Sequence, residues 1–161
     1  MNFSKFLEQK LANGEDLGDK RSSILYKDFD RLKGRRAICM CYTAGFQHQS
    51  ITTGIQLLRN ICIEAGILLE IEINSNRFSS INNLTDVDLV FFLNTTGEIF
   101  DQNQRNVFKQ WYNSGNKGFI GIHAAADTMT SWDWYVKLVG AKFTYHSMPP
   151  TQYHDATMTN L

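Results

Sequence analysis

Short apolar runs alternate with helical stretches over most of the chain. Continuous apolar runs, which are typical of buried strands, occur at 37–42, 68–73, 87–93 and 118–122. Apolar residues recur at helical spacing at 51–65, at 101–113 after Asp101 as the N-cap, and at 134–139 before Gly140. Two late strands are predicted at 142–145 and 152–158. Buried strands separated by helices predict an α/β fold, a flavodoxin-like three-layer sandwich with a mostly parallel sheet.

The first 34 residues follow a different pattern. Apolar side chains recur at helical spacing over 3–11, before Asn13-Gly14, and again over 24–32, before Gly34. No chemistry is visible in this part of the sequence. We therefore predict a helical extension over residues 1–34 and an α/β domain over residues 35–161.

Charge and cysteine content narrow the class of protein. The 161 residues carry 16 basic and 16 acidic side chains, a balance that gives no electrostatic footprint for nucleic acid or for an anionic membrane. No apolar run approaches the ~20 residues of a membrane helix, and the charged start is unlike a signal peptide. Three cysteines are too few for a disulfide scaffold and fit a reducing compartment. We expect a cytoplasmic protein that binds neither nucleic acid nor membranes.

Three of the four histidines fall at predicted strand ends, where sheets of this class hold their ligands. They are His48, His123 and His146, which we take as candidate catalytic residues together with Asp127. Each histidine alone has the alternative of being a solvated surface residue, and Asp127 that of a helix N-cap or a turn residue. Three histidines at one rim also allow a divalent metal site, although no local metal motif supports one.

The stretch from Gly118 to Asp127 indicates a sharp turn between a strand and a helix. A glycine-containing strand, one bulky residue and three alanines are typical of a nucleophile elbow, with His123 at the position of the nucleophile. This disfavours acyl transfer through a thiolate. The three cysteines do not supply a nucleophilic thiolate either, because they lie in a predicted buried strand or on an apolar helix face. We interpret them as packing residues: Cys39, Cys41 and Cys62.

Polar and aromatic side chains in the same loops are candidate ligand contacts. Amide and hydroxyl groups suit polyhydroxylated or phosphorylated ligands, and an indole ring can stack on a sugar. The candidates for substrate binding are Gln47, Asn94, Thr95, Thr96 and Trp134. The alternatives are ordinary turn chemistry for the polar residues and core packing for the aromatic stripe of Trp132 and Tyr135.

Several blocks, in collinear order over about residues 36–158, resemble the trehalose-utilisation (ThuA-like) family. They are TAGFQHQSI at 43–51, FLNTTG at 92–97, GFIGIHAAADT at 118–128, WDWY at 132–135, LVGA at 138–141, and His146. The resemblance implies a class I glutamine-amidotransferase-like fold in which His123 replaces the elbow cysteine, so glutamine amidotransferase activity is not expected. It also implies that His48, His123 and His146 occupy recurrent histidine positions with Asn94 and Asp127 beside them. Members usually continue past the strand predicted at 152–158, which implies a C-terminally shortened domain.

Three functions remain open from the sequence. The first is a carbohydrate-active enzyme, hydrolase- or isomerase-like and linked by the resemblance to trehalose or glycoside metabolism, with His123 as acid/base, His48 and His146 as its partners or as metal ligands, and Asp127 orienting. The second is a non-catalytic sugar-binding or interaction domain with an incomplete site. A flavodoxin-like electron carrier ranks last, because loop 43–48 lacks the small hydroxyl residues that cradle a phosphate. The expected ligand is a small carbohydrate, and a homo-oligomer is left open.

Overall fold

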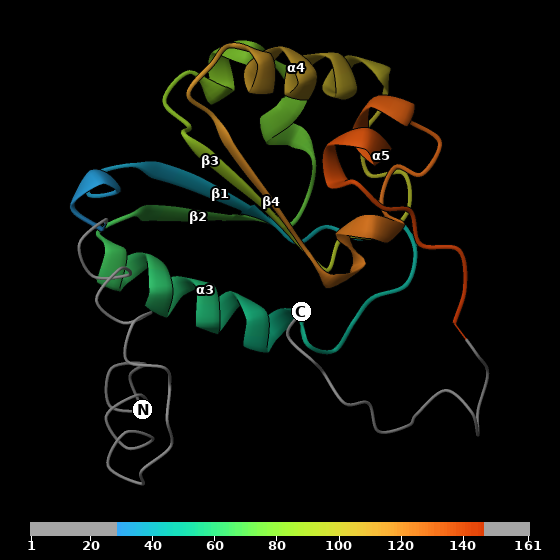
Figure 1. Ribbon diagram of the computed structural model, residues 1–161, viewed down its shortest axis with the longest axis horizontal. Coiled ribbons are helices and arrows are strands. Elements are labelled where there is room, and N and C mark those ends of the chain that lie inside the picture. Colours follow the sequence, from blue (N-terminus) through green and yellow to red (C-terminus); the bar gives the residue numbers. More distant parts are fainter. Residues whose placement is uncertain (1–28, 147–161) are drawn as a thin grey trace, which may run out of the picture.

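The computed structural model describes residues 29–146, which form a parallel four-stranded sheet with helices on both faces (Figure 1). The strand order is β2-β1-β3-β4. The strands are β1 (Arg36–Met40), β2 (Leu68–Glu72), β3 (Leu89–Leu93) and β4 (Gly118–Ile122). Each overlaps a run that the sequence predicts as a strand, although β1 begins one residue earlier and ends two residues earlier than the run at 37–42. This order corresponds to the first four strands of the flavodoxin-like arrangement, so the predicted fold class is confirmed.

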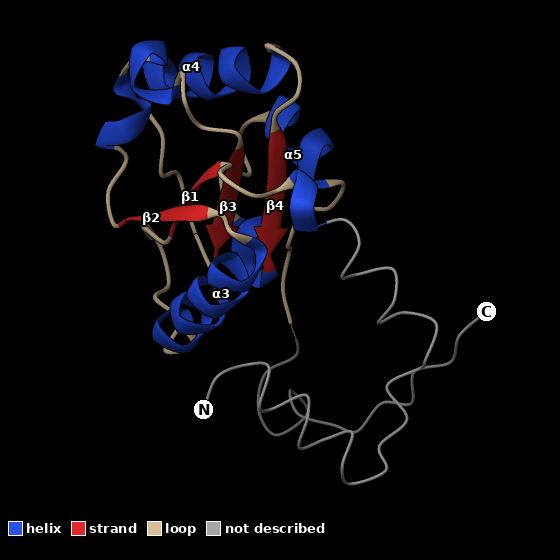
Figure 2. Cartoon of the chain, turned by 90° about the vertical axis from the view of Figure 1, so that its left-hand side faces the viewer, coloured by secondary structure: helices blue, strands red, loops and turns tan. Residues whose placement is uncertain are grey.

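Helix α3 covers one face of the sheet, and α4 and α5 cover the other (Figure 2). Their bounds are α3 (Ile51–Ala65), α4 (Gln102–Asn113) and α5 (Asp133–Val139). Helix α4 begins at the predicted cap: the Asp101 carboxylate accepts from the Gln104 amide at 2.8 Å, and the Gln104 side chain accepts from the Asp101 amide at 3.0 Å. This capping box satisfies two amides that the first helical turn leaves unpaired.

Alternate side chains of the strands divide the core into two layers. Ile38 and Met40 of β1 point toward α4 and α5, whereas Ala37 and Cys39 point toward α3. The three thiols are buried and unpaired, as packing residues should be. Burial raises the pKa of the Cys39 thiol to about 12, which removes it as a nucleophile near neutral pH.

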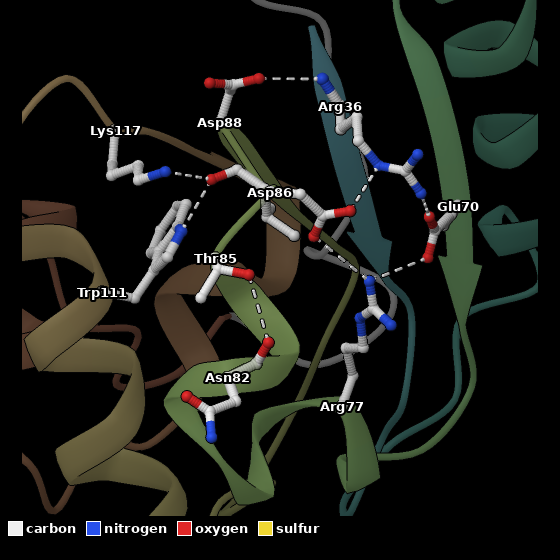
Figure 3. Close-up of polar contacts among 10 residues, drawn as sticks. Arg36, Glu70, Arg77, Asn82, Thr85, Asp86, Asp88, Trp111 and Lys117 are labelled. Atoms are coloured by element: carbon white, nitrogen blue, oxygen red, sulfur yellow. Dashed lines mark hydrogen bonds and ion pairs between the residues drawn. The ribbon is translucent and has the colours of Figure 1, made fainter.

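The amino-terminal ends of the strands are joined by a network of charged side chains (Figure 3). The Arg36 guanidinium on β1 pairs with Glu70 on β2 and with Asp86, and Arg77 approaches the same two carboxylates. The Arg36 amide donates to Asp88 at 3.0 Å. Half-exposed ion pairs contribute roughly 0–1 kcal/mol each, so the network serves mainly to fix strand order and register at this edge.

Four of the elements predicted from the sequence are not confirmed. The strand predicted at 142–145 is wrong: residues 141–146 are exposed and irregular, and the Phe143 amide donates to the Ala126 carbonyl at 2.9 Å rather than to a neighbouring strand. Of the helix predicted at 24–32, the described part holds a 3-10 turn, Phe29–Arg31. The helix at 3–11 and the strand at 152–158 lie outside the described residues. Within residues 29–146 no helix is long and apolar enough to cross a membrane.

Candidate functional site

The loops that follow β1, β3 and β4 are tied together at the carboxyl edge of the sheet. The Ala44 amide donates to the Thr96 carbonyl at 2.8 Å, and the Gly97 amide donates to the Asp127 carbonyl at 2.9 Å. From β1 the chain crosses to β2 on one side and then to β3 on the other. The edge between β1 and β3 is therefore the switch in strand order at which open α/β sheets bind ligands.

His123 occupies a sharp turn directly after β4. Its φ of 53° is in the left-handed region, and the 3-10 turn η4 (His123–Asp127) starts at this residue. Left-handed backbone is costly for a residue with a Cβ, and such strain clusters at functional sites. The turn between strand and helix that the sequence predicts is present, and it places an exposed imidazole at the rim.

A chain of hydrogen bonds fixes the His123 ring. Its Nδ1 lies 3.0 Å from Asn94 Oδ1, and Asn94 Nδ2 donates to Ser50 Oγ at 2.9 Å. Because the Asn94 amide donates to Ser50 through nitrogen, its oxygen faces the histidine and requires a proton on Nδ1. This leaves Nε2 of the neutral ring as a proton acceptor. Asn94 is 4% exposed and left-handed at φ 51°, so it is a rigid support.

His48 contacts His123 edge to face. The ring centroids are 4.7 Å apart at an interplanar angle of 88°. His48 Nδ1 is buried without a hydrogen-bond partner among the described residues. A buried acceptor without a partner is less unusual than a buried N–H without one, so the proton belongs on the outer nitrogen, Nε2. Burial, and after it His123, lower the pKa of His48, whereas Asp127 raises it. Because the net effect lowers the pKa, the ring is neutral at pH 7.

The pKa of His48 gives a testable prediction. We expect it to titrate below the ordinary 6.5, to fall further in Asp127→Asn, and to rise in His123→Gly, because each variant removes one of the opposing charges. The unfolded chain then protonates first, so stability decreases as the pH falls below about 6.5. NMR titration of the imidazole carbon signals measures this. Asp133→Asn, an exposed carboxylate on α5, is the control and should change nothing; a midpoint above 6.5 would contradict the prediction.

A shallow pocket of about 290 Å³ opens beside His123, between the start of α3 and the ends of β3 and β4. Its lining is mainly apolar with a few hydroxyl and amide groups and one imidazole, the usual composition of a small-molecule site. The lining residues are Ser50, Thr53, Gly54, Leu57, Leu93, Asn94, Ile122 and His123.

Comparison with known proteins identifies the family. Residues 36–160 match the family model of ThuA, described as trehalose utilisation. The chain belongs to the ThuA family. No curated protein matches it. A crystal structure of a ThuA-like protein from Bacteroides uniformis ATCC 8492 is 21% identical with a TM-score of 0.51, and the match covers 66% of this chain and 44% of that one. This likeness supports the fold, and the chain matches less than half of that protein's length.

The two threonines predicted to bind ligand have interior positions in this ThuA chain. Thr95 is fully buried, with its hydroxyl 2.7 Å from that of Thr128. Thr96 is 1% exposed and donates to the Phe46 carbonyl at 2.7 Å. Both hydroxyls hold the loops together and do not reach the pocket, so the structure assigns them a structural role.

The remaining predicted residues are dispersed around the rim. Trp134 is half-buried in an aromatic layer, with its ring 4.9 Å from that of Trp132, whereas the sequence offered core packing as the alternative for Trp132 and Tyr135. Gln47 and His146 are exposed and do not line the pocket, and the His146 ring lies 5.9 Å from that of Phe143. Asp127 acts electrostatically on His48, whereas the group that orients His123 is Asn94.

Two features of the site escaped the sequence analysis. Ser50, which ends the relay from His123, is the residue before α3, and the only available signal was its place in the loop after β1. The α3 side of the pocket, Thr53 and Leu57, looked like ordinary helix surface. Among the described residues no three His, Cys, Asp or Glu side chains gather in a way that could hold a metal ion, so the three-histidine metal site is not formed there.

Proposed function

We propose that this ThuA-family chain binds a small carbohydrate at the pocket lined by His123, whose ring contacts His48, and transfers a proton on it. The family's association with trehalose utilisation supports the ligand class. The observation that carries the chemistry is the relay from Ser50 through Asn94 to His123, which presents an unprotonated Nε2 beside the pocket. A base that is held in position within reach of the proton it takes is suited to proton transfer.

The two imidazoles take complementary roles. His123 Nε2 accepts a proton from a carbon next to a sugar carbonyl, and the neutral His48 donates its Nε2–H to the carbonyl oxygen on which negative charge develops. The hydroxyl proton on the deprotonated carbon then passes to the former carbonyl oxygen, and the proton on His123 returns to the former carbonyl carbon. The carbonyl thus moves by one carbon and no bond to water is made. A neutral histidine whose pKa is lowered is a suitable electrophile for such an enolisation.

The lining of the pocket favours isomerisation over hydrolysis. Glycoside hydrolysis usually uses two carboxylates on opposite sides of the scissile bond. None of the described residues that line this pocket is a carboxylate. Its volume of about 290 Å³ is at the small end of ligand sites, which suits one sugar ring.

Proton exchange tests this proposal directly. In D₂O, the wild-type chain should exchange the carbon-bound hydrogen next to the carbonyl of a keto- or aldohexose, and this is followed by NMR as loss of the proton signal. Asn94→Gly keeps the left-handed backbone and removes the orienting amide, so the exchange rate should fall at least tenfold.

Asn116→Gly is the matched control, because Asn116 has the same left-handed backbone, with φ 54°, on the exposed turn after α4. It should exchange like wild type. Sugar binding that shifts the His123 signals without any exchange would support the non-catalytic binding domain instead. No shift with any sugar would refute both.

A further inference from the structure

Phe46 is an exposed aromatic residue next to His48 at the rim of the site. Its side chain is 70% exposed, although it belongs to the loop that carries His48. An aromatic ring left in water forgoes the burial that most phenylalanines obtain in folding. The other aromatic side chain considered for ligand binding, Trp134, has its ring in contact with Trp132, Tyr112 and Phe108.

The backbone around Phe46 is held firmly. Its carbonyl accepts a 2.7 Å hydrogen bond from Thr96, which is itself 1% exposed. The two preceding amides, Ala44 and Gly45, both donate to the Thr96 carbonyl, at 2.8 and 3.2 Å. The loop backbone that carries the exposed ring is therefore held in advance, and a loop held in advance loses little backbone entropy when a ligand binds.

The ring also lies at the right distance from the chemistry. Its centroid is 4.9 Å from that of His48 at an interplanar angle of 85°, and His48 in turn lies 4.7 Å from His123. The contact with His48 is edge to face, and with most of the side chain exposed, ring surface remains open to a ligand. The rings of Phe46 and His123 thus both contact the ring of His48 at the rim.

We propose that Phe46 is the specificity-determining stacking platform of the site, which receives the apolar C–H face of the closed sugar ring when the sugar binds, before ring opening supplies the carbonyl on which His48 and His123 act. The inference rests on the proposed function and adds a recognition role for this residue. A ligand without such a face, such as a small open-chain acid, gains nothing from the ring. Pyranoses should therefore be preferred.

Titration with methyl α-D-glucopyranoside and trehalose, followed by NMR shifts, tests the proposal. Phe46→Ala should weaken binding about tenfold, whereas Phe46→Trp, which restores an aromatic face, should stay within about threefold of wild type. Ile63→Ala, a side chain on α3 that is 75% exposed, is the matched control and should bind like wild type. Saturation of the Phe46 ring protons in the wild-type chain should transfer to the sugar C–H protons, a readout that needs no variant.

The outcomes separate this proposal from the one on which it rests. Unchanged affinity in Phe46→Ala, or equal losses in Phe46→Ala and Phe46→Trp, would overturn the stacking role and leave the proposed function standing. If no sugar shifts the His123 signals of the wild-type chain, both fail. If Phe46→Ala converts a dimer into a monomer in sedimentation and sugar affinity is kept, a second copy covers the ring and the proposal is overturned.

Discussion

Replacing His123 by glycine should lower the rate of proton exchange on the sugar at least about a hundredfold. The stability of the protein should stay as before. The imidazole supplies the proposed base, so its loss removes the chemistry. The left-handed backbone at φ 53° costs a residue with a Cβ roughly 1–2 kcal/mol, and glycine relieves this cost. The flexibility of glycine in the unfolded chain and the lost bond to Asn94 each offset about 1 kcal/mol.

We therefore expect the free energy of unfolding of His123→Gly to lie within about 1 kcal/mol of the wild-type value, as measured by urea denaturation. Asn116→Gly, with φ 54° on an exposed turn, reports the backbone effect alone and should keep full exchange. A His123→Gly chain that still exchanges at the wild-type rate would disprove the role of His123. A large loss of stability would show that the ring is a structural support instead.

Gly97→Ala should destabilise the protein by about 3 kcal/mol, through backbone strain and overpacking together. Gly97 has φ 73°, and an added Cβ would lie 2.9 Å from the Gly45 amide nitrogen and 3.1 Å from the Ala44 carbonyl carbon. The Gly97 backbone cannot move away easily, because its amide donates a hydrogen bond to Asp127 and its carbonyl accepts one from Met129. The backbone of Ala44 and Gly45 is held by the hydrogen bonds of both amides to the Thr96 carbonyl. The substitution would force the loop that carries His48 away from the loop after β3.

Gly115→Ala separates the two contributions, because Gly115 also has a positive φ, 86°, with nothing within 4 Å of an added Cβ. It should cost only about 1 kcal/mol. Denaturation midpoints of both variants, at unchanged slope, give the difference. Equal losses would mean that the close approach of the two loops does not stabilise the site.

The pattern of apolar residues was sufficient to predict the strands of the sheet and the helices that cover it. The runs around β1 and β3 are buried on both faces, so they could be read without alternation, and α3 and α4 have continuous apolar stripes. The prediction of a strand at 142–145 was wrong because a segment forms a strand only if a neighbouring strand supplies hydrogen bonds. There the chain runs beside η4, and Phe143 bonds to Ala126.

The local sequence was also sufficient to predict the sharp turn at His123 and the position of His48 after β1, since both depend on which residue follows a strand. It could not decide which polar side chains face the pocket. Thr95 and Thr96 have the composition of a ligand-binding loop, yet their hydroxyls bond to Thr128 and to Phe46, which come from other loops. Those partners lie 33 and 50 residues away in the sequence, beyond any local signal.

The sequence by itself determined the succession of strands and helices along residues 36–139, the family, and the presence of an imidazole at a sharp turn. Each of these can be read from short segments of neighbouring residues. The tertiary structure alone decided that Asn94 and Ser50 orient that imidazole, that the half-buried Trp134 packs against other aromatic rings, and that Phe46 faces outward. These outcomes depend on hydrogen bonds and packing between loops that only the closed sheet brings together.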